Sequence, residues 1–266
     1  MENSFIKILI PLAIVCVVLY FLRKLFKYPK VGSMCMVTGG VKTGKSTFSV
    51  ALVYREWKKR HTAWKFRCFF QKLFKVPLDE EPLIYSNIPL GVPYVPLTLD
   101  LIQRKKRFNY GSVIYICEAS LVADSQMVKD KELNERLLMF NKLIGHELKG
   151  GVIFYDTQSI ADVHYSVKRC LSEYFYIHHL VKWIPFFLVA YVREERYSED
   201  GSVVQVSDGD AEDKLTRVII PKKTWKMFDC YCYSALTDDL PVENTVVTAN
   251  SLKAVEIVSF KEDRLK

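Results

Sequence analysis

The sequence predicts an α/β fold with a mostly parallel central sheet, an antiparallel β extension and an N-terminal transmembrane helix. Three observations predict it: an apolar block near the N-terminus, a glycine-rich loop between a short apolar run and a helical segment, and β-rich segments after Glu173. The chain has 266 residues, of which 50% are hydrophobic and 26% charged, so whole-chain disorder is excluded. The net charge of +8 favours an anionic partner, either nucleic acid or a membrane surface.

The apolar block at residues 5–22 reads FIKILIPLAIVCVVLYFL and is interrupted only by Lys7 and Pro11. It exceeds the lower limit of about 17 residues for a bilayer-spanning helix. A cleaved signal peptide would carry its charge before the block, and a buried core helix fits poorly with a basic stop. Four cations follow it: Arg23, Lys24, Lys27 and Lys30. The positive-inside rule therefore predicts a single-pass anchor with the N-terminus outside and the remaining chain in the cytoplasm.

The glycine-rich segment that follows is the strongest local signal. It matches the P-loop pattern G-x-x-x-x-G-K-[ST], after an apolar run at 34–37 and before a helical segment at 46–59. In such a loop the backbone N–H groups converge on phosphate oxygens at a helix N-terminus. Lys45 would reach the β- and γ-phosphates, and Ser46 would coordinate Mg²⁺. A glycine turn that only caps a helix is the alternative. The expected nucleotide-binding residues are Gly39, Gly40, Val41, Lys42, Thr43, Gly44, Lys45, Ser46 and Thr47.

A second motif lies at residues 113–120, which read VIYICEAS. Glu118 closes this apolar strand and fits a catalytic base that polarises the attacking water and also ligates Mg²⁺. Cys117 occupies the position where an aspartate usually stands, and a thiol is a poor ligand for a hard cation. Either Glu118 performs both tasks, or hydrolysis is slow. A glutamate that merely caps a strand end is the alternative.

A third apolar strand is expected at 152–155, and Asp156, Thr157 and Gln158 follow it. In P-loop ATPases with an additional strand between the two motifs, a polar residue at this strand's tip lies beside the γ-phosphate. Gln158 is the first candidate and Thr157 the second. An N-cap for a helix starting at Ser159 is the alternative interpretation of this segment.

The ordered motifs resemble one family. The P-loop is followed by SNIP at 86–89, the strand ending in Glu118, His146 with Gly150 and Gly151, TQS at 157–159, Arg169, and WKMFD at 225–229. This set resembles the zonular occludens toxin family, the assembly ATPases of filamentous phages, over about residues 33–235. The resemblance implies a RecA-like P-loop motor of the additional-strand group, which uses ATP with Mg²⁺ in the bacterial inner membrane. It also implies an arginine finger, for which Arg169 is the first candidate and Arg193, Arg196 and Arg217 are the alternatives.

The resemblance implies a homo-oligomeric ring that drives virion assembly or DNA export, with the membrane, single-stranded DNA or nucleoprotein, and other phage assembly or coat proteins as partners. Genome packaging and conjugative transfer are alternative motor functions. A nucleotide-binding scaffold with little hydrolysis is the non-motor alternative, favoured by Cys117. The chain departs from the family in Cys117, in its N-terminal span and in lacking the later span, so we infer no toxin activity.

The expected organisation is an anchor with its basic flank at 1–30, an ATPase domain at 31–237 with its β-rich extension from about 174, and a tail at 238–266. The segment at 55–75 is rich in both cations and aromatic residues. Such a segment suits single-stranded nucleic acid, an anionic membrane surface, or an ordinary amphipathic helix with a solvated basic face. The sequence leaves all three open.

Overall fold

The computed structural model describes residues 17, 20, 28–102, 107–122, 139–146, 148–197, 203–204 and 215–228. Within these ranges no helix is both long and apolar enough to cross a bilayer. The anchor predicted at 5–22 lies outside them except for Val17 and Tyr20, and the predicted tail at 238–266 lies outside them entirely.

Nine strands of the described residues form one sheet in the order β3-β2-β4-β5-β1-β6-β7-β8, and β9 also pairs with β7. The first six strands of this order pair in parallel, and β7, β8 and β9 continue as antiparallel strands. This is the predicted mixed α/β sheet with an antiparallel extension. The strands are β1 (Met34–Gly39), β2 (Ile84–Ser86), β3 (Val95–Pro96), β4 (Val113–Ile116), β5 (Val152–Thr157), β6 (Glu173–Val181), β7 (Phe187–Tyr197), β8 (Val203–Val204) and β9 (Thr216–Pro221).

The position of β5 in the sheet determines which strand ends lie side by side. It lies between β1, which precedes the glycine-rich loop, and β4, which precedes Glu118. Thr38 pairs with Thr157, and Ile116 pairs with Tyr155, so the three strands end at one edge of the sheet. The additional strand expected between the two motifs is therefore confirmed.

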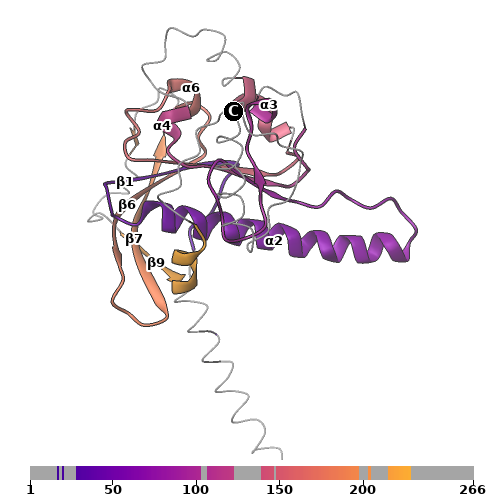
Figure 1. The fold of residues 1–266 in the computed structure, drawn as a ribbon, viewed down its shortest axis with the longest axis horizontal. Coiled ribbons are helices and arrows are strands. Elements are labelled where there is room, and N and C mark those ends of the chain that lie inside the picture. The colour runs from indigo at the N-terminus through magenta and orange to yellow at the C-terminus, as the bar shows by residue number, and fades with distance from the viewer. Residues whose placement is uncertain are drawn as a thin grey trace, which may run out of the picture.

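Helices cover both faces of the sheet (Figure 1). The long helix α2 (Lys45–Leu73) runs beneath it, and the short helices α3 (Leu99–Ile102), α4 (Ala119–Val122) and α6 (Tyr165–Lys168) lie above it (Figure 1). Residues of β1 point alternately to the two faces, so Cys35 and Val37 pack with Phe48 of α2, and Met36 packs in the opposite cluster. Burial on both faces is typical of parallel strands, and it explains their continuous apolar runs.

One local expectation is wrong. No helix starts at Ser159: its hydroxyl accepts a hydrogen bond from the Ala161 N–H at 3.1 Å, and α6 begins only at Tyr165. The hydroxyl serves a local turn instead, because serine side chains compete readily with helical backbone bonding.

Helix α2 continues well beyond the predicted end at Lys59. No glycine or proline interrupts it before Leu73, and its C-terminal part projects past the sheet (Figure 1). The segment after the helix returns along one side of this projection, where the Trp57 and Trp64 indoles donate to the carbonyls of Pro82 and Asp79. We call residues 59–74, the projecting end, the arm.

Candidate functional site: the phosphate loop and two carboxylates

The phosphate loop has the backbone that its sequence requires. Thr43 folds the loop back, since both its N–H and its hydroxyl donate to the Gly40 carbonyl. Gly44 has φ +93°, a conformation that favours glycine, and a Cβ there would come within 2.6 Å of Leu180. A Cβ on Gly39 would come within 2.8 Å of the Ile177 carbonyl oxygen. The loop therefore needs glycine at both ends of the motif.

Lys45 stands at the start of α2 and meets two carboxylates. Its Nζ lies 2.9 Å from Glu118 Oε1 and 3.7 Å from Asp156 Oδ1. The lysine side chain is 7% exposed, that of Asp156 is fully buried, and that of Glu118 is 28% exposed. The strand ends of β1, β4 and β5 thus bring together one cation and two acids, of which the exposed one is best placed to meet a ligand.

Asp156 is the residue that sequence reasoning missed. Its carboxylate accepts hydrogen bonds from the Tyr115 hydroxyl at 2.7 Å and from the Glu118 N–H at 3.1 Å. Burial, followed by the charge of Asp156, holds the pKa of Tyr115 well above its ordinary value, so the phenol remains a donor. An aspartate at the tip of an apolar strand, next to the strand that carries Glu118, was the available signal.

Glu118 is held in a left-handed backbone conformation with φ +51°. For a residue with a side chain this conformation costs roughly 1–2 kcal/mol. The bond from its N–H to Asp156 and the ion pair of its carboxylate with Lys45 fix the residue at both ends. The strain is therefore located at the residue predicted to be the catalytic base.

Cys117 remains a neutral thiol. Burial raises its pKa, and the negative charge of Asp156 raises it further. A protonated thiol does not ligate a hard cation, so Cys117 cannot replace the usual aspartate in that task. Asp156 instead supplies a second carboxylate at this edge of the sheet.

Asn87, in the SNIP segment, fixes the end of β4. Its side-chain amide donates to the Cys117 carbonyl at 2.9 Å and accepts from the Cys117 N–H at 2.8 Å. Asn87 is buried, and the Ser86 hydroxyl closes the turn beside it by accepting from the Ile88 N–H at 3.1 Å. The segment thus positions the backbone immediately before Glu118.

We expect Asn87→Ala to lower the free energy of unfolding by about 2–3 kcal/mol, because it leaves two backbone groups of Cys117 unsatisfied. It should also lower ATP turnover, because Glu118 loses its support. Chemical denaturation measures the first effect and steady-state kinetics the second. Asn87→Asp keeps the acceptor but places a buried charge against the Cys117 carbonyl, so it should lose at least as much stability as alanine; a stability equal to that of the unmodified protein would contradict the role of the amide donor.

The other predicted site residues lie at two different places. Thr157 is buried, and exposed Gln158 follows it at the strand edge where the phosphate loop begins. Arg169 is exposed and comes three residues before Ser172, whose N–H donates to the carbonyl of Met34 at the opposite end of β1. Gln158 therefore shares the edge of the Lys45 cluster, whereas Arg169 could act only on another copy of the chain.

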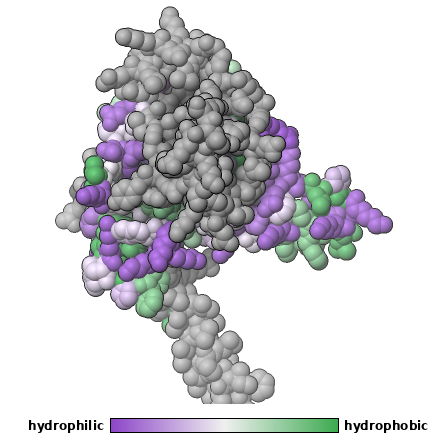
Figure 2. Space-filling view, in the orientation of Figure 1, coloured by the Kyte–Doolittle hydropathy of each residue, from purple (hydrophilic) through white to green (hydrophobic). Residues whose placement is uncertain are grey.

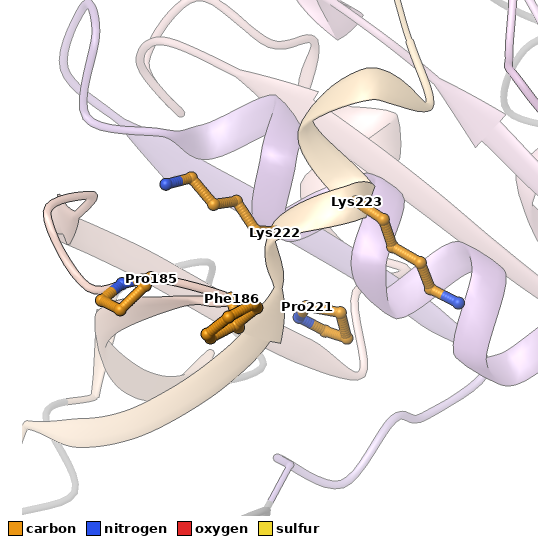
Figure 3. Close-up of a pocket in the computed structure, with 5 residues that line it drawn as sticks. All are labelled: Pro185, Phe186, Pro221, Lys222 and Lys223. Carbon is orange, nitrogen blue, oxygen red and sulfur yellow. The ribbon is translucent and has the colours of Figure 1, made fainter.

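One hollow among the described residues lies away from the phosphate loop. It has a volume of about 540 Å³ and lies between the turn that precedes β7 and the start of the short 3₁₀ helix η1 (Lys222–Lys226) (Figure 3). None of its lining residues belongs to the phosphate loop or to the Lys45 cluster: Pro185, Phe186, Pro221, Lys222 and Lys223.

The residues present fit a nucleotide with Mg²⁺. The crowded glycines let the loop backbone approach phosphate oxygens, and Lys45 and the start of α2 supply positive charge. Half-buried Ser46 follows Lys45, and oxygen donors are what Mg²⁺ prefers. No group of three or more acidic, histidine or cysteine side chains forms a metal site among the described residues.

No protein-family model matches the sequence, and no curated protein matches it. Solved structures do. The N-terminal domain of zonular occludens toxin from Neisseria meningitidis matches with 14% identity and a TM-score of 0.44, over 75% of this chain and 100% of that one. The genome-packaging NTPase B204 of Sulfolobus turreted icosahedral virus 2, bound to ATP-γ-S, matches with 12% identity and a TM-score of 0.32, over 62% and 97%.

The DNA-packaging ATPase B204 of Sulfolobus turreted icosahedral virus matches with 12% identity and a TM-score of 0.33, over 63% of this chain and 98% of that one. The resemblance to a zonular occludens toxin that the ordered motifs predicted is thus found again among the solved structures. Because all three TM-scores are below 0.5, the function proposed next rests on the geometry of the site.

Proposed function

We propose that this chain is a membrane-anchored ATPase motor that drives the assembly of a phage or mobile-element virion, or the export of its DNA, across the bacterial inner membrane. The observation that carries the proposal is the meeting of Lys45, Glu118 and Asp156 at one sheet edge, beside a phosphate loop. A loop that only capped a helix would need neither the buried lysine nor the two acids.

Each residue has a separate task in this proposal. Lys45 and the loop N–H groups bind the β- and γ-phosphates, and the Ser46 hydroxyl holds Mg²⁺. Glu118, the more exposed acid, accepts a proton from the attacking water. Asp156 orients Glu118 through its N–H and adds negative charge near the cation. Gln158 contacts the γ-phosphate, and Arg169 reaches the site of a neighbouring subunit in a ring.

The anchor and its orientation remain proposals based on the sequence. Residues 5–22 would span the inner membrane once, with the N-terminus outside and the ATPase domain in the cytoplasm. Single-stranded DNA, nucleoprotein and coat proteins are the candidate cargo and partners. Packaging and conjugative transfer remain the alternative motor functions.

The non-motor alternative is a nucleotide-binding scaffold, and it depends on Cys117 being a defect. Because Asp156 already supplies a second carboxylate, we expect Cys117→Ala to change kcat by less than about threefold and to cost about 1 kcal/mol of stability. Steady-state ATPase assays and thermal unfolding measure both. A loss of turnover of a hundredfold or more would assign chemistry to the thiol.

The motor is tested by ATP turnover of the full chain in lipid nanodiscs, with and without single-stranded DNA. We expect Mg²⁺-dependent turnover that DNA accelerates. ATP turnover that DNA leaves unchanged but that coat protein accelerates would favour virion assembly over DNA export. Nucleotide binding without turnover under any of these conditions would support the scaffold and reject the motor.

A further inference from the structure

The arm carries an apolar stripe that faces away from the rest of the domain. Five side chains form it, each 40–70% exposed: Phe66, Phe69, Phe70, Leu73 and Phe74. The first four stand at helical positions i, i+3, i+4 and i+7, so they share one face of α2. Ring contacts of 5.0 Å and 5.6 Å join Phe70 to Phe66 and Phe69. The arm thus carries a solvent-exposed cluster of aromatic rings.

The opposite face of the arm is covered by the returning segment. Gln71 and Asp79 exchange two hydrogen bonds, of 2.9 Å and 3.1 Å, and Arg67 forms an ion pair of 3.2 Å with Asp79. Trp57, His61 and Trp64 stack along this side. The returning segment therefore fixes the arm as a helix and leaves the aromatic stripe bare.

Positive charge surrounds the stripe. Between Arg55 and Leu78 the one acidic residue is Glu56, which is buried. The acids of the returning segment are already paired: Asp79 with Arg67, Glu80 with Arg107, and Glu81 with His61. Hydrophobic and hydrophilic residues gather together at the projecting end (Figure 2). The exposed cations of this region are Arg55, Lys58, Lys59, Lys65, Arg67, Lys72 and Lys75.

The course of the chain relates this stripe to the membrane. Arg55 and Lys59 lie on the same helical face as Phe66 and Phe70, at spacings of four and seven residues. The Arg55 guanidinium stacks on the Tyr28 ring at 4.1 Å. Tyr28 is the point from which the chain leads back to the basic flank and the apolar block at 5–22. Tyr28, which directly follows the basic flank in the sequence, therefore contacts a residue of the helical face that carries the stripe.

We propose that the arm lies on the surface of an anionic bilayer, with the aromatic stripe in the headgroup region and the flanking cations on lipid phosphates. Arg55 to Leu73 covers about 27 Å of helix. Aromatic rings with lysine and arginine on their flanks are the composition of interfacial helices, and the cations strengthen binding to an anionic surface. Nucleic acid would also accept these residues, but the contact of this face with Tyr28 favours lipid. The inference uses the predicted anchor and is independent of ATP hydrolysis.

Hydrogen–deuterium exchange of the full chain tests this in nanodiscs of phosphatidylcholine alone and in discs that also contain phosphatidylglycerol. We expect amides at 66–74 to exchange about tenfold more slowly in the anionic discs. Phe69→Ser with Phe70→Ser should abolish this difference. Val76→Ser with Leu78→Ser is the matched control, because it removes two exposed apolar side chains from the returning segment, and it should preserve the difference.

Equal exchange in the two kinds of disc would overturn the proposal. Protection that appears only when a single-stranded oligonucleotide is added would also overturn it. So would protection that rises with protein concentration in detergent, because that would indicate that a second copy of the chain covers the stripe. Exchange of β1 amides and ATP turnover are followed in every variant. Normal β1 exchange excludes misfolding. Protection of the arm without turnover would leave this inference standing while the motor fails.

Discussion

Glu118→Gln is expected to lower kcat for ATP by about 100-fold to 1,000-fold while nucleotide affinity changes by less than about threefold. Glutamine preserves the shape of the side chain and can still accept a hydrogen bond from Lys45, which lies 2.9 Å away. It cannot accept a proton from water. The change therefore separates proton transfer from phosphate binding, which both involve the same cluster.

Steady-state kinetics give kcat, and titration with a non-hydrolysable ATP analogue gives affinity. Glu81→Gln is the matched control, because its exposed carboxylate pairs with His61 outside the site, and it should leave both quantities unchanged. A Glu118→Gln enzyme with normal kcat would assign the base to another residue, with Asp156 as the nearest carboxylate along the same edge.

Asp156→Asn is expected to have the second largest effect, on activity and stability together. The side chain is fully buried and accepts from Tyr115 and from the Glu118 N–H. An amide can satisfy only part of this bonding, and Lys45 keeps one carboxylate instead of two. We expect about 2 kcal/mol less stability and a kcat about 100-fold lower.

Tyr115→Phe is the comparison that separates these two effects. It removes one hydrogen bond to Asp156 and leaves the charge, so it should cost about 1–2 kcal/mol with a much smaller loss of kcat. Chemical denaturation and ATPase assays on both variants measure this. Equal losses of kcat would show that Asp156 acts through packing of β4 against β5, and not through its charge.

The sequence predicted the parts of the site that depend on local order. The glycines, Lys45 and Ser46 follow one another along the chain, and Glu118 is marked by the apolar run before it. The additional strand was predictable because its two glycines, its apolar residues and the polar residues at its end also follow one another along the chain. The three roles expected of Gln158, Arg169 and Glu118 remain predictions.

Asp156 could not be assigned in the same way. It lies 38 residues from Glu118, and the two meet only because β5 pairs beside β4 in one register. The same holds for Asn87, whose contacts with Cys117 span 30 residues. Position 117 on its own therefore predicts a weakened site, whereas the structure places the buried carboxylate of Asp156 on the neighbouring strand. A helix over 55–75 was one of the open interpretations of the sequence, and the structure shows it as a continuation of the helix after the phosphate loop.

The central claim is that Lys45, Glu118 and Asp156 form a site for ATP hydrolysis. The most direct test compares Mg²⁺-dependent ATP turnover by the full chain and by Lys45→Ala, purified in the same way and both shown to be folded. We expect turnover by the unmodified chain and a loss of about 100-fold or more in the variant. Equal turnover by the two proteins, or none by either, would contradict it.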